Sequence, residues 1–481
     1  MTNFSGKPLS PKTGNAACRG PQGGGMDSRR NGVAEISPKY LAEVASNAIP
    51  SGYKQTEVGV IPEDWEVVTL GDIGQTVIGL TYSPNDVADF GTLVLRSSNV
   101  QNGKLAYADN VYVNMELPER VIVKQGDILI CVRNGSRQLI GKCALIDENA
   151  EGSAFGAFMS IFRTKYSVFV FYQFQSDLIQ NQINEIMGAT INQITNKDMS
   201  GFKITLPSDE KEQTAIANAL SDVDALISEL EKLIAKKQAI KTATMQQLLT
   251  GRTRLPQFAL REDGTPKGIK PSELGEIPED WEVGAIGDSC RTYSGGTPST
   301  SNKNFYGGGI KWITSSDLNQ GVIHDVAGRI TDAGLNGSSA KLVEAHTLLI
   351  ALYGATAGVC AITRISAAIN QAVLAIVPAE HNSEYLFYWF TRHKEVIIET
   401  YTQGGQPNLS GDIVRSIKLA FPPVNEQTAI ATILSDMDAE IQALEQRLGK
   451  TRHIKQGMMQ ELLTGKTRLV QPSLTGVCYA D

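Results

Sequence analysis

Two blocks of identical residues, each occurring twice, dominate this sequence. The heptapeptide IPEDWEV at Ile61–Val67 recurs without change at Ile277–Val283, an offset of 216 positions (277 − 61). The hexapeptide EQTAIA occupies Glu212–Ala217 and again Glu426–Ala431, an offset of 214 (426 − 212). A period this long is not that of a solenoid and indicates a duplicated domain. The chain is therefore predicted to contain two copies of one scaffold, related by an internal pseudo-two-fold repeat.

Between these blocks the two copies keep a common frame and differ in their polar loops. Gly141–Leu145 (GKCAL) aligns with Gly358–Ile362 (GVCAI), but the connection that precedes this segment is longer in the first copy. It carries RNGSR at Arg133–Arg137, where the second copy has YGAT at Tyr353–Thr356. Loops that vary on a constant scaffold are the usual place for binding residues.

A long amphipathic helix is predicted at the end of each copy. From Ile216 and from Ile430, apolar residues recur at alternating spacings of four and three, which is typical of a coiled coil. Each helix should run about 40 residues, or about 60 Å. Residues 208–231 hold seven acids and one base, whereas 232–254 hold six bases and no acid, and the second helix repeats this division. Antiparallel pairing would set each acidic half beside a basic half, although the same charges also suit the helix dipole.

Composition and missing motifs exclude several function classes. The 44 Lys and Arg against 51 Asp and Glu give a net charge of −7, so no overall basic field marks a nucleic-acid or membrane-surface protein. The six cysteines form no CxxC and suit a reducing compartment, so a cytoplasmic location is expected. The uncharged stretch from Ala345 to Thr363 contains two glycines and is interpreted as strand, turn and strand instead of a membrane span.

No catalytic constellation stands out either. The five histidines form no HxxxH or HExxH, no GxGxxG follows a strand, and Gly465–Thr467 lacks the first glycine of a phosphate loop. We therefore expect no catalytic residue, metal or cofactor in this chain. Besides a non-catalytic recognition protein, two function classes stay open. They are a stand-alone DNA-modifying enzyme and a coiled-coil scaffold protein.

The polar loops contain many side chains that can read base edges. In the first copy the candidate DNA-binding residues are Arg96, Asn99, Arg133, Asn134, Ser136, Arg137 and Lys142. In the second copy they are Lys311, Thr314, Ser316, Asp317, Asn319, Tyr353, Thr356, Gln406 and Asn408. Trp65 and Trp281, inside the identical blocks, are interpreted as core anchors.

With these features the sequence resembles the specificity subunits of type I restriction-modification enzymes. The resemblance covers about residues 52–470 and rests on the doubled IPEDWEV and EQTAIA blocks and the doubled LLTG exit. It also includes SGGTPS at Ser294–Ser299 and GQPN at Gly405–Asn408, whereas Gly188–Asn192 of the first copy matches the last segment only loosely.

The resemblance implies an α+β protein with two similar mixed α/β target recognition domains, joined and separated by two long helices that form an antiparallel coiled coil. Each domain would read one half of an asymmetric bipartite site in double-stranded DNA. Two methyltransferase subunits would dock on the chain, restriction subunits would join them, and the complex would direct adenine methylation and restriction. S-adenosylmethionine would then belong to the methyltransferase subunit, and ATP and Mg to the restriction subunit.

The same resemblance sets the expected boundaries. The segments are a disordered tail 1–50, a first target recognition domain 51–207, a central helix 208–255, a linker 256–274, a second target recognition domain 275–422, a C-terminal helix 423–470 and a tail 471–481. The repeated start of each helix is expected to bind the partner subunits through Glu212, Gln213, Ile216, Glu426, Gln427 and Ile430.

Overall fold

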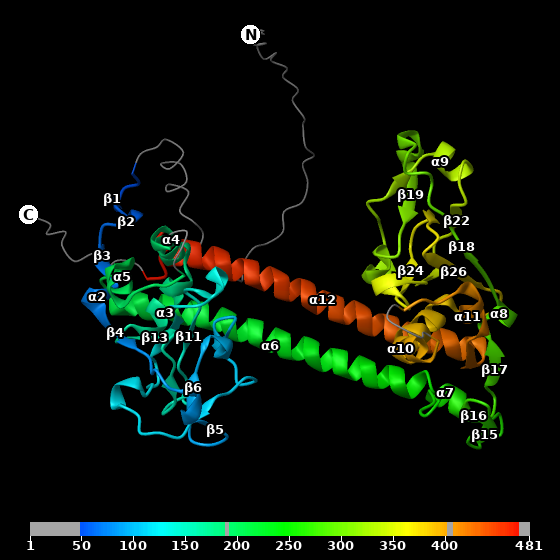
Figure 1. The fold of residues 1–481 in the computed structure, drawn as a ribbon, viewed down its shortest axis with the longest axis horizontal. Coiled ribbons are helices and arrows are strands. Elements are labelled where there is room, and N and C mark those ends of the chain that lie inside the picture. Colours follow the sequence, from blue (N-terminus) through cyan, green and yellow to red (C-terminus); the bar gives the residue numbers. More distant parts are fainter. Residues whose placement is uncertain (1–48, 188–191, 402–406, 471–481) are drawn as a thin grey trace, which may run out of the picture. The chain divides into compact units, whose positions relative to one another are not determined.

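The computed structural model describes residues 49–187, 192–401 and 407–470, and it divides into two compact units (Figure 1). Unit 1 extends to Leu220 and takes up the chain again from Gly457, so it contains both ends of the described chain. Unit 2 is Ser221–Gln456. Most of the predicted N-terminal tail, the C-terminal tail 471–481 and Gln406 lie outside the described residues.

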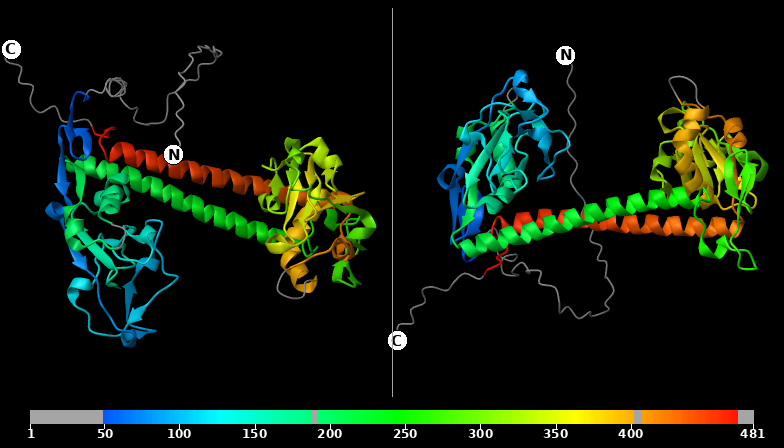
Figure 2. Two further views of the ribbon diagram at one scale, coloured as in Figure 1. Left: turned by 45° about the horizontal axis from the view of Figure 1, so that its top comes forward. Right: turned by 90° about the horizontal axis from the view of Figure 1, so that it is seen from below.

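Two helices of 39 residues each follow the coiled-coil pattern, α6 (Glu210–Leu248) and α12 (Val424–Leu462). Their parts within unit 2 lie side by side in Figures 1 and 2. Four ion pairs join the acidic part of one helix to the basic part of the other, namely Asp224–Lys455 (2.8 Å), Glu231–Arg452 (2.7 Å), Lys237–Glu440 (2.7 Å) and Lys241–Asp438. The predicted antiparallel pairing is therefore confirmed.

The apolar seam of these helices is buried where the four-three spacing is regular. Ile227, Leu230 and Ile441 are all below 9% exposed. After the break in spacing at Lys237 and Thr451, the sequence predicts that the apolar stripe resumes at Ile240, Met245 and Leu248 and at Ile454, Met458 and Leu462. Met245, Leu248 and Leu462 are buried, whereas Ile240 and Ile454 are 42% and 47% exposed. The expectation is wrong for Ile240 and Ile454, because the change of spacing turns both positions out of the seam.

Three residues after the end of each long helix lies a glycine that no other residue could replace easily. Gly251 and Gly465 adopt φ of +68° and +71°, in the left-handed region that favours glycine. A Cβ at Gly251 would lie 2.5 Å from the Pro278 ring, and one at Gly465 would lie 2.5 Å from the Pro62 ring. The repeated LLTG exit and the repeated IP dipeptide thus pack on each other within each unit.

Unit 1 is built on two four-stranded sheets. The first has the order β11 (Cys143–Leu145), β10 (Ile128–Cys131), β13 (Met159–Thr164), β4 (Gly74–Ile78), and the second β12 (Ala154–Phe155), β6 (Thr92–Leu95), β9 (Tyr112–Val113), β5 (Val87–Ala88). Three two-stranded pairs are β1 (Tyr53–Thr56) with β2 (Gly59–Pro62), β3 (Trp65–Thr69) with β14 (Lys203–Pro207), and β7 (Val100–Gln101) with β8 (Lys104–Leu105). The helices are α2 (Leu70–Ile73), α3 (Ser167–Gln175), α4 (Asp177–Ile186) and α5 (Asn196–Gly201).

Unit 2 repeats this plan. Its five-stranded sheet has the order β18 (Cys290–Ser294), β26 (Val373–Pro378), β23 (Leu348–Ala351), β24 (Cys360–Thr363), β20 (Val322–Ile323). Its four-stranded sheet is β21 (Arg329–Ile330), β19 (Tyr306–Ile313), β25 (Ala367–Ile369), β22 (Lys341–Val343), and two pairs are β15 (Ile269–Ser272) with β16 (Gly275–Pro278) and β17 (Glu282–Ala285) with β27 (Lys418–Phe421). The helices are α7 (Pro256–Ala259), α8 (Ile286–Ser289), α9 (Asp332–Asn336), α10 (Ser383–Tyr401) and α11 (Gly411–Ser416).

The two units match in their cores as well as in their strands. In both sheets the central strand pairs antiparallel with its neighbours, β10 with β11 and β13, and β23 with β24 and β26. The adjoining helices carry the same edge-to-face aromatic pair, Phe171–Tyr172 at 5.1 Å in α3 and Phe387–Tyr388 at 5.0 Å in α10. The predicted α+β fold with two similar mixed domains and two long helices is confirmed.

Two further segments can be compared with the expectations from the sequence. The uncharged stretch forms β23 and β24 with a turn between them, as predicted. Across the parts of the chain that the structure describes, none of the helices is both long and apolar enough to cross a membrane. The expected linker 256–274, in contrast, contains α7 and β15, and Arg261 within it forms two hydrogen bonds with Glu279.

Candidate nucleic-acid interface

Four segments of unit 1 meet where strands β6 and β10 end. Asn134 donates from Nδ2 to Ser97 Oγ (3.1 Å), which joins the loop after β10 to the turn after β6. The backbone N–H of Arg133 donates to Phe158 O (3.1 Å), and Arg133 also forms an isolated β-bridge with Gln193. Residues 96–99, 133–137, 156–158 and 192–193 therefore form one surface, which we call the unit 1 loop surface.

Unit 2 assembles the same four segments with different side chains. The Asn370 N–H donates to Ile313 O (3.1 Å), and the Leu352 N–H donates to Ala372 O (2.8 Å). Tyr353 forms an isolated β-bridge with Asn408, in the place where unit 1 has the Arg133–Gln193 bridge. Residues 314–317, 353–356, 370–372 and 407–408 make up the unit 2 loop surface.

Several predicted DNA-binding residues are exposed on the unit 1 loop surface or beside it. Arg133, Ser136, Arg137 and Lys142 are exposed, and Asn134 is half-buried. Arg137 donates to the backbone oxygen of Asn184 (3.3 Å). The long polar loop thus presents most of its predicted side chains to solvent.

The turn at Arg96 differs from the expectation. Asn99 is fully buried, accepts from the Arg96 N–H (2.9 Å) and donates to Ala106 O (2.9 Å). Arg96 forms an ion pair with Asp109 (2.9 Å). Asn99 is therefore a turn cap and its side chain has no free edge for a base, so the prediction that it contacts DNA is corrected here.

In the equivalent turn of unit 2, a predicted DNA-binding side chain also caps its own turn. Asp317 accepts from the N–H and the hydroxyl of Thr314 (both 2.8 Å), so it caps the turn as Asn99 does. Ser316 is exposed and lies 3.0 Å from the Thr314 hydroxyl, and Asn319 donates to Ser316 O (3.0 Å). Lys311 forms an ion pair with Asp325 (3.1 Å). These polar groups are engaged within their own unit.

Three further predicted residues of unit 2 lie on its loop surface. Tyr353 is 39% exposed, Asn408 is exposed, and Thr356 is half-buried. Gln406 lies outside the described residues. The Tyr353–Asn408 bridge brings two predicted residues together that are 55 positions apart (408 − 353).

Two residues of the unit 1 loop surface were missed by sequence reasoning. Gln193 occupies the position of Asn408, which an alignment of Gly188–Asn192 with the GQPN segment does not show. Phe158 is 55% exposed beside Arg133. A phenylalanine in one copy at a position where the other has Ala372 is the sequence signal that could have identified it.

The predicted partner-binding residues are placed in the interior of their own units. Glu212, Gln213, Ile216, Glu426, Gln427 and Ile430 are all at most 7% exposed. Gln213 donates to Pro207 O (2.7 Å), and Gln427 donates to Pro422 O (2.8 Å). A partner subunit could not contact these buried side chains directly, so any docking must use exposed neighbours.

The two glutamates instead organise a cluster of charges in each unit, which we call the end cluster. In unit 1, Glu212 accepts from Trp65 Nε1 (3.0 Å) and from two nitrogens of Arg468 (2.5 and 2.7 Å). Arg468 also donates to both carboxylate oxygens of Asp64 (2.9 and 2.7 Å). Trp65 is fully buried, which confirms its interpretation as a core anchor.

Unit 2 has the same end cluster. Glu426 accepts from Trp281 Nε1 (3.1 Å) and from Arg254 (2.7 and 2.6 Å), and Arg254 also donates to Asp280 (2.8 and 3.0 Å). Burial alone would raise the pKa of Asp280, but hydrogen bonds from Arg254 and Lys267 outweigh it and hold that pKa at about 2. Asp280 is therefore ionised throughout the physiological pH range.

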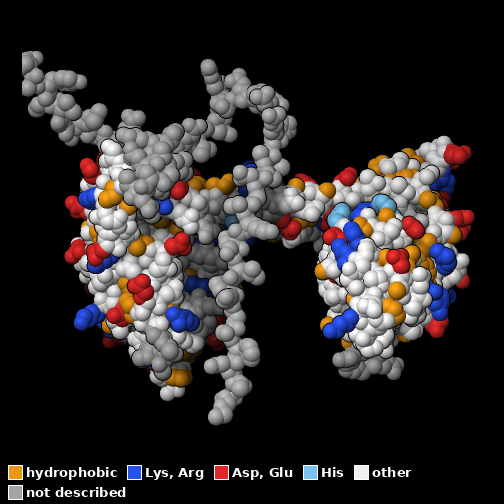
Figure 3. Space-filling view, turned by 90° about the horizontal axis from the view of Figure 1, so that it is seen from above, with side chains coloured by type: hydrophobic (Ala, Val, Ile, Leu, Met, Phe, Trp, Pro, Cys, Tyr) orange, Lys and Arg blue, Asp and Glu red, His pale blue; other side chains and the backbone are white. Residues whose placement is uncertain are grey.

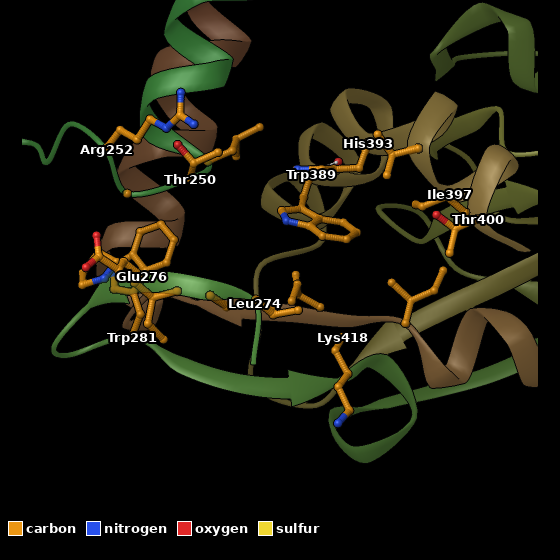
Figure 4. Close-up of a pocket in the computed structure, with 18 of the residues that line it drawn as sticks. Thr250, Arg252, Leu274, Glu276, Trp281, Trp389, His393, Ile397, Thr400 and Lys418 are labelled. Atoms are coloured by element: carbon orange, nitrogen blue, oxygen red, sulfur yellow. Dashed lines mark hydrogen bonds between the residues drawn. The ribbon is translucent and has the colours of Figure 1, made fainter. Parts of the chain in front are cut away.

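A pocket of about 820 Å³ lies in unit 2 between the end of α6, the β15–β16 hairpin and α10 (Figure 4). Trp389 points into it and stacks on His393 at a ring distance of 4.3 Å. Burial lowers the pKa of His393 below its ordinary value. Glu276 is the one carboxylate among its lining residues, and the other titratable side chains there include His393, Tyr401 and Lys418.

In the part of the chain that the structure describes, positive and negative surface charges are mixed, and potential metal ligands are not grouped. On the face shown in Figure 3, Lys and Arg side chains lie among Asp and Glu side chains in each unit. Among the residues that the structure describes, no group of three His, Cys, Asp or Glu side chains could hold a metal ion. What the geometry offers is a pair of loop surfaces on one scaffold, suited to recognition by hydrogen bonds.

Comparison with known proteins agrees with this arrangement. The family described as type I restriction modification DNA specificity domain matches residues 62–242 and 278–451. The putative type I restriction enzyme MjaX specificity subunit of Methanocaldococcus jannaschii is 29% identical over 435 residues, covering 87% of this chain and 97% of the relative. The EcoKI specificity subunit of Escherichia coli K12 is 23% identical over 432 residues, covering 85% and 90%.

The fold is likewise that of a solved relative. The S subunit of a type I restriction-modification system from M. genitalium superposes with a TM-score of 0.53 at 16% identity, covering 83% of this chain and 96% of that one. The repeat, the two loop surfaces and the long helices define a DNA-recognition protein with duplicated specificity domains. The chain belongs to the family of type I restriction-modification specificity subunits.

Proposed function

We propose that this chain directs a type I restriction-modification complex to an asymmetric bipartite DNA site. Unit 1 reads one half-site through its loop surface, and unit 2 reads the other half-site. The chain itself performs no catalysis. Adenine methylation and restriction are performed by its partner subunits on the DNA that it selects.

One observation carries this proposal. The two units hold the same four segments with equivalent backbone bridges, Arg133–Gln193 and Tyr353–Asn408, yet they present different polar side chains. A common backbone with different hydrogen-bonding groups is what two unlike half-sites require, because base edges differ in their pattern of donors and acceptors.

Phosphate contacts would then come largely from the partners. The net charge of −7 gives this chain little non-specific attraction for DNA, since such attraction scales with the phosphates that Lys and Arg neutralise. Two methyltransferase subunits, each with S-adenosylmethionine, would complete the DNA clamp. Restriction subunits with ATP and Mg would join them.

The partner subunits need exposed apolar contacts, and the long helices offer a matched pair. Ile240 in α6 and Ile454 in α12 occupy equivalent positions, 214 residues apart (454 − 240), and both are exposed. Exposed β-branched residues at equivalent helix positions suit two identical partners, because a duplicated surface binds duplicated subunits. We place one methyltransferase contact at each.

Reconstitution with the cognate methyltransferase subunit tests the proposed function. The purified chain should transfer no methyl group from labelled S-adenosylmethionine. The assembled complex should contain one specificity chain with two methyltransferase subunits, and it should methylate adenine within one bipartite sequence. Methyl transfer by the chain alone, or methylation without sequence preference by the complex, would overturn the proposal.

A further inference from the structure

Phe158 has an unusual position for a large apolar side chain. It lies within a tight turn in which the Met159 N–H donates to Gly156 O (2.8 Å), and its ring is 55% exposed. The backbone N–H groups of Val132 and Arg133 both donate to Phe158 O (3.1 Å each). The backbone is thus fixed from two sides, while the ring remains at the surface.

The scaffold does not need an aromatic ring here. In unit 2 the same place is taken by Ala372, which is buried and accepts from the Leu352 N–H (2.8 Å) in the same way. The turn before it is also the same, because the Val373 N–H donates to Asn370 O (3.3 Å). Since a methyl group is sufficient for this fold, the phenyl ring of Phe158 serves another purpose.

Arg133 is the group that the ring contacts. Its guanidinium carbon lies 5.4 Å from the centroid of the Phe158 ring, within the range of a cation–π contact. Among the described residues, the Arg133 guanidinium forms no ion pair and no hydrogen bond. In contrast, Arg96 is paired with Asp109, and Arg137 donates to the Asn184 backbone.

The Arg133 guanidinium, which has no ion pair or hydrogen bond among the described residues and lies over an aromatic ring, is positioned to bind a planar group. Stacking restricts the rotation of the side chain and leaves its N–H donors free at the edge. Two parallel donors from arginine match O6 and N7 of guanine in the major groove. The amide of Gln193 lies on the neighbouring segment and belongs to the same surface.

We infer that Phe158 is a positioning residue that orients the Arg133 guanidinium toward a guanine in the half-site read by unit 1. The inference rests on the proposed function, because it names the base and the side-chain pair of one loop surface. Phe158 acts through Arg133, so aromatic character at this position matters and size alone does not.

The experiment uses the chain reconstituted with its methyltransferase subunits and a library of DNA sites. Phe158→Leu should lower the preference for one guanine of the unit 1 half-site by about tenfold, whereas Phe158→Tyr should retain it. Arg133→Lys should lower the preference for the same guanine, because lysine keeps the positive charge but lacks the two parallel N–H donors of arginine. Recognition of the other half-site should not change.

Two controls keep the interpretation specific. Phe90→Leu alters another exposed phenylalanine of unit 1, which is 65% exposed and precedes β6, whereas the loop-surface residues 96–99 follow that strand, and it should leave every base preference unchanged. Thermal unfolding of each variant should match the wild type, since Phe158 is largely exposed. If Phe158→Leu keeps the guanine preference, or weakens binding equally at all sequences, the inference is overturned. Failure of the wild-type complex to select any sequence would instead refute the proposed function.

Discussion

Arg468 and Glu212 lie 256 positions apart (468 − 212) in the sequence and form a bidentate ion pair inside unit 1. Arg468 Nε donates to Glu212 Oε1 (2.5 Å), and Arg468 Nη2 donates to Glu212 Oε2 (2.7 Å). Glu212 lies in the first turn of α6, and Arg468 follows the end of α12. The arginine also binds Asp64, two residues after the Pro62 that packs on Gly465. The last described residues of the chain therefore complete the first domain, and they do so through charges that are 18% and 2% exposed.

Removing Arg468 should destabilise unit 1 strongly. Arg468→Ala leaves the buried carboxylate of Glu212 without its cation, which costs about 3–5 kcal/mol in the free energy of unfolding. Denaturant unfolding of the full chain measures this loss. Lys232→Ala, which breaks the exposed Lys232–Glu229 pair, is the matched control and should cause no measurable change. Equal stability of both variants would contradict the assigned role of the end cluster.

Stability at low pH should depend on Asp280. Its pKa is held at about 2, below the ordinary 3.8, so its contribution is complete above about pH 4 and disappears as the pH falls toward 2. Asp280→Asn should make unit 2 less stable at pH 7 and should reduce the loss of stability between pH 4 and pH 2. Glu399→Gln, an exposed change in α10, should keep the wild-type dependence. The contradicting result is an Asp280→Asn variant that follows the wild-type pH curve.

Each exposed helix isoleucine should hold one methyltransferase subunit. Ile240→Lys should reduce the reconstituted complex to one bound methyltransferase subunit, and so should Ile454→Lys, because a charge in an apolar contact must be desolvated. The double variant should bind none. The masses of the complexes, measured by light scattering, decide the stoichiometry. Two bound subunits in the double variant would place docking elsewhere, and Ile430→Val, within the core, serves as a control that keeps both.

Helix length should set the gap between the two half-sites. Four residues inserted after Ala235 in α6 and four after Glu445 in α12 keep the ion pairs on both sides of the insertions, because Asp224 and Glu231 lie on one side and Lys237 and Lys241 on the other. One helical turn adds about 6 Å, or roughly two base pairs of B-DNA. The preferred gap should therefore grow by one or two base pairs. A four-residue insertion after Gly264, in an exposed turn, should leave it unchanged.

The sequence predicted those features that depend on periodicity or on identity between the copies. The four-three spacing from Ile216 and Ile430 identified both helices, and the charge gradient that they share, acidic in the first half and basic in the second, predicted their antiparallel pairing. Trp65 and Trp281 were identified as core anchors because large aromatic residues in identical blocks are usually buried. Each of these inferences uses residues that are close in sequence or repeated.

What escaped prediction depends on contacts between distant residues. The end cluster joins Arg254 to Glu426, 172 positions away, and no local pattern reports such a pair. Asn99 and Asp317 carry suitable groups for base readout, but whether a side chain caps its own turn is decided by backbone geometry. Gln193 was missed because the loops of the two copies differ in length, so their alignment shifts by one residue.

The most direct test of the whole account is the map of methylated adenines produced by reconstituted complexes with one altered loop surface. Arg133→Ala should relax recognition of one half-site by about 1–3 kcal/mol at a single base pair, and Asn408→Ala should relax only the other half-site. The gap and the unaltered half-site should remain as in the wild type. If both substitutions affect the same half-site, or if each lowers methylation equally at every sequence, the two loop surfaces do not read separate halves of the DNA site.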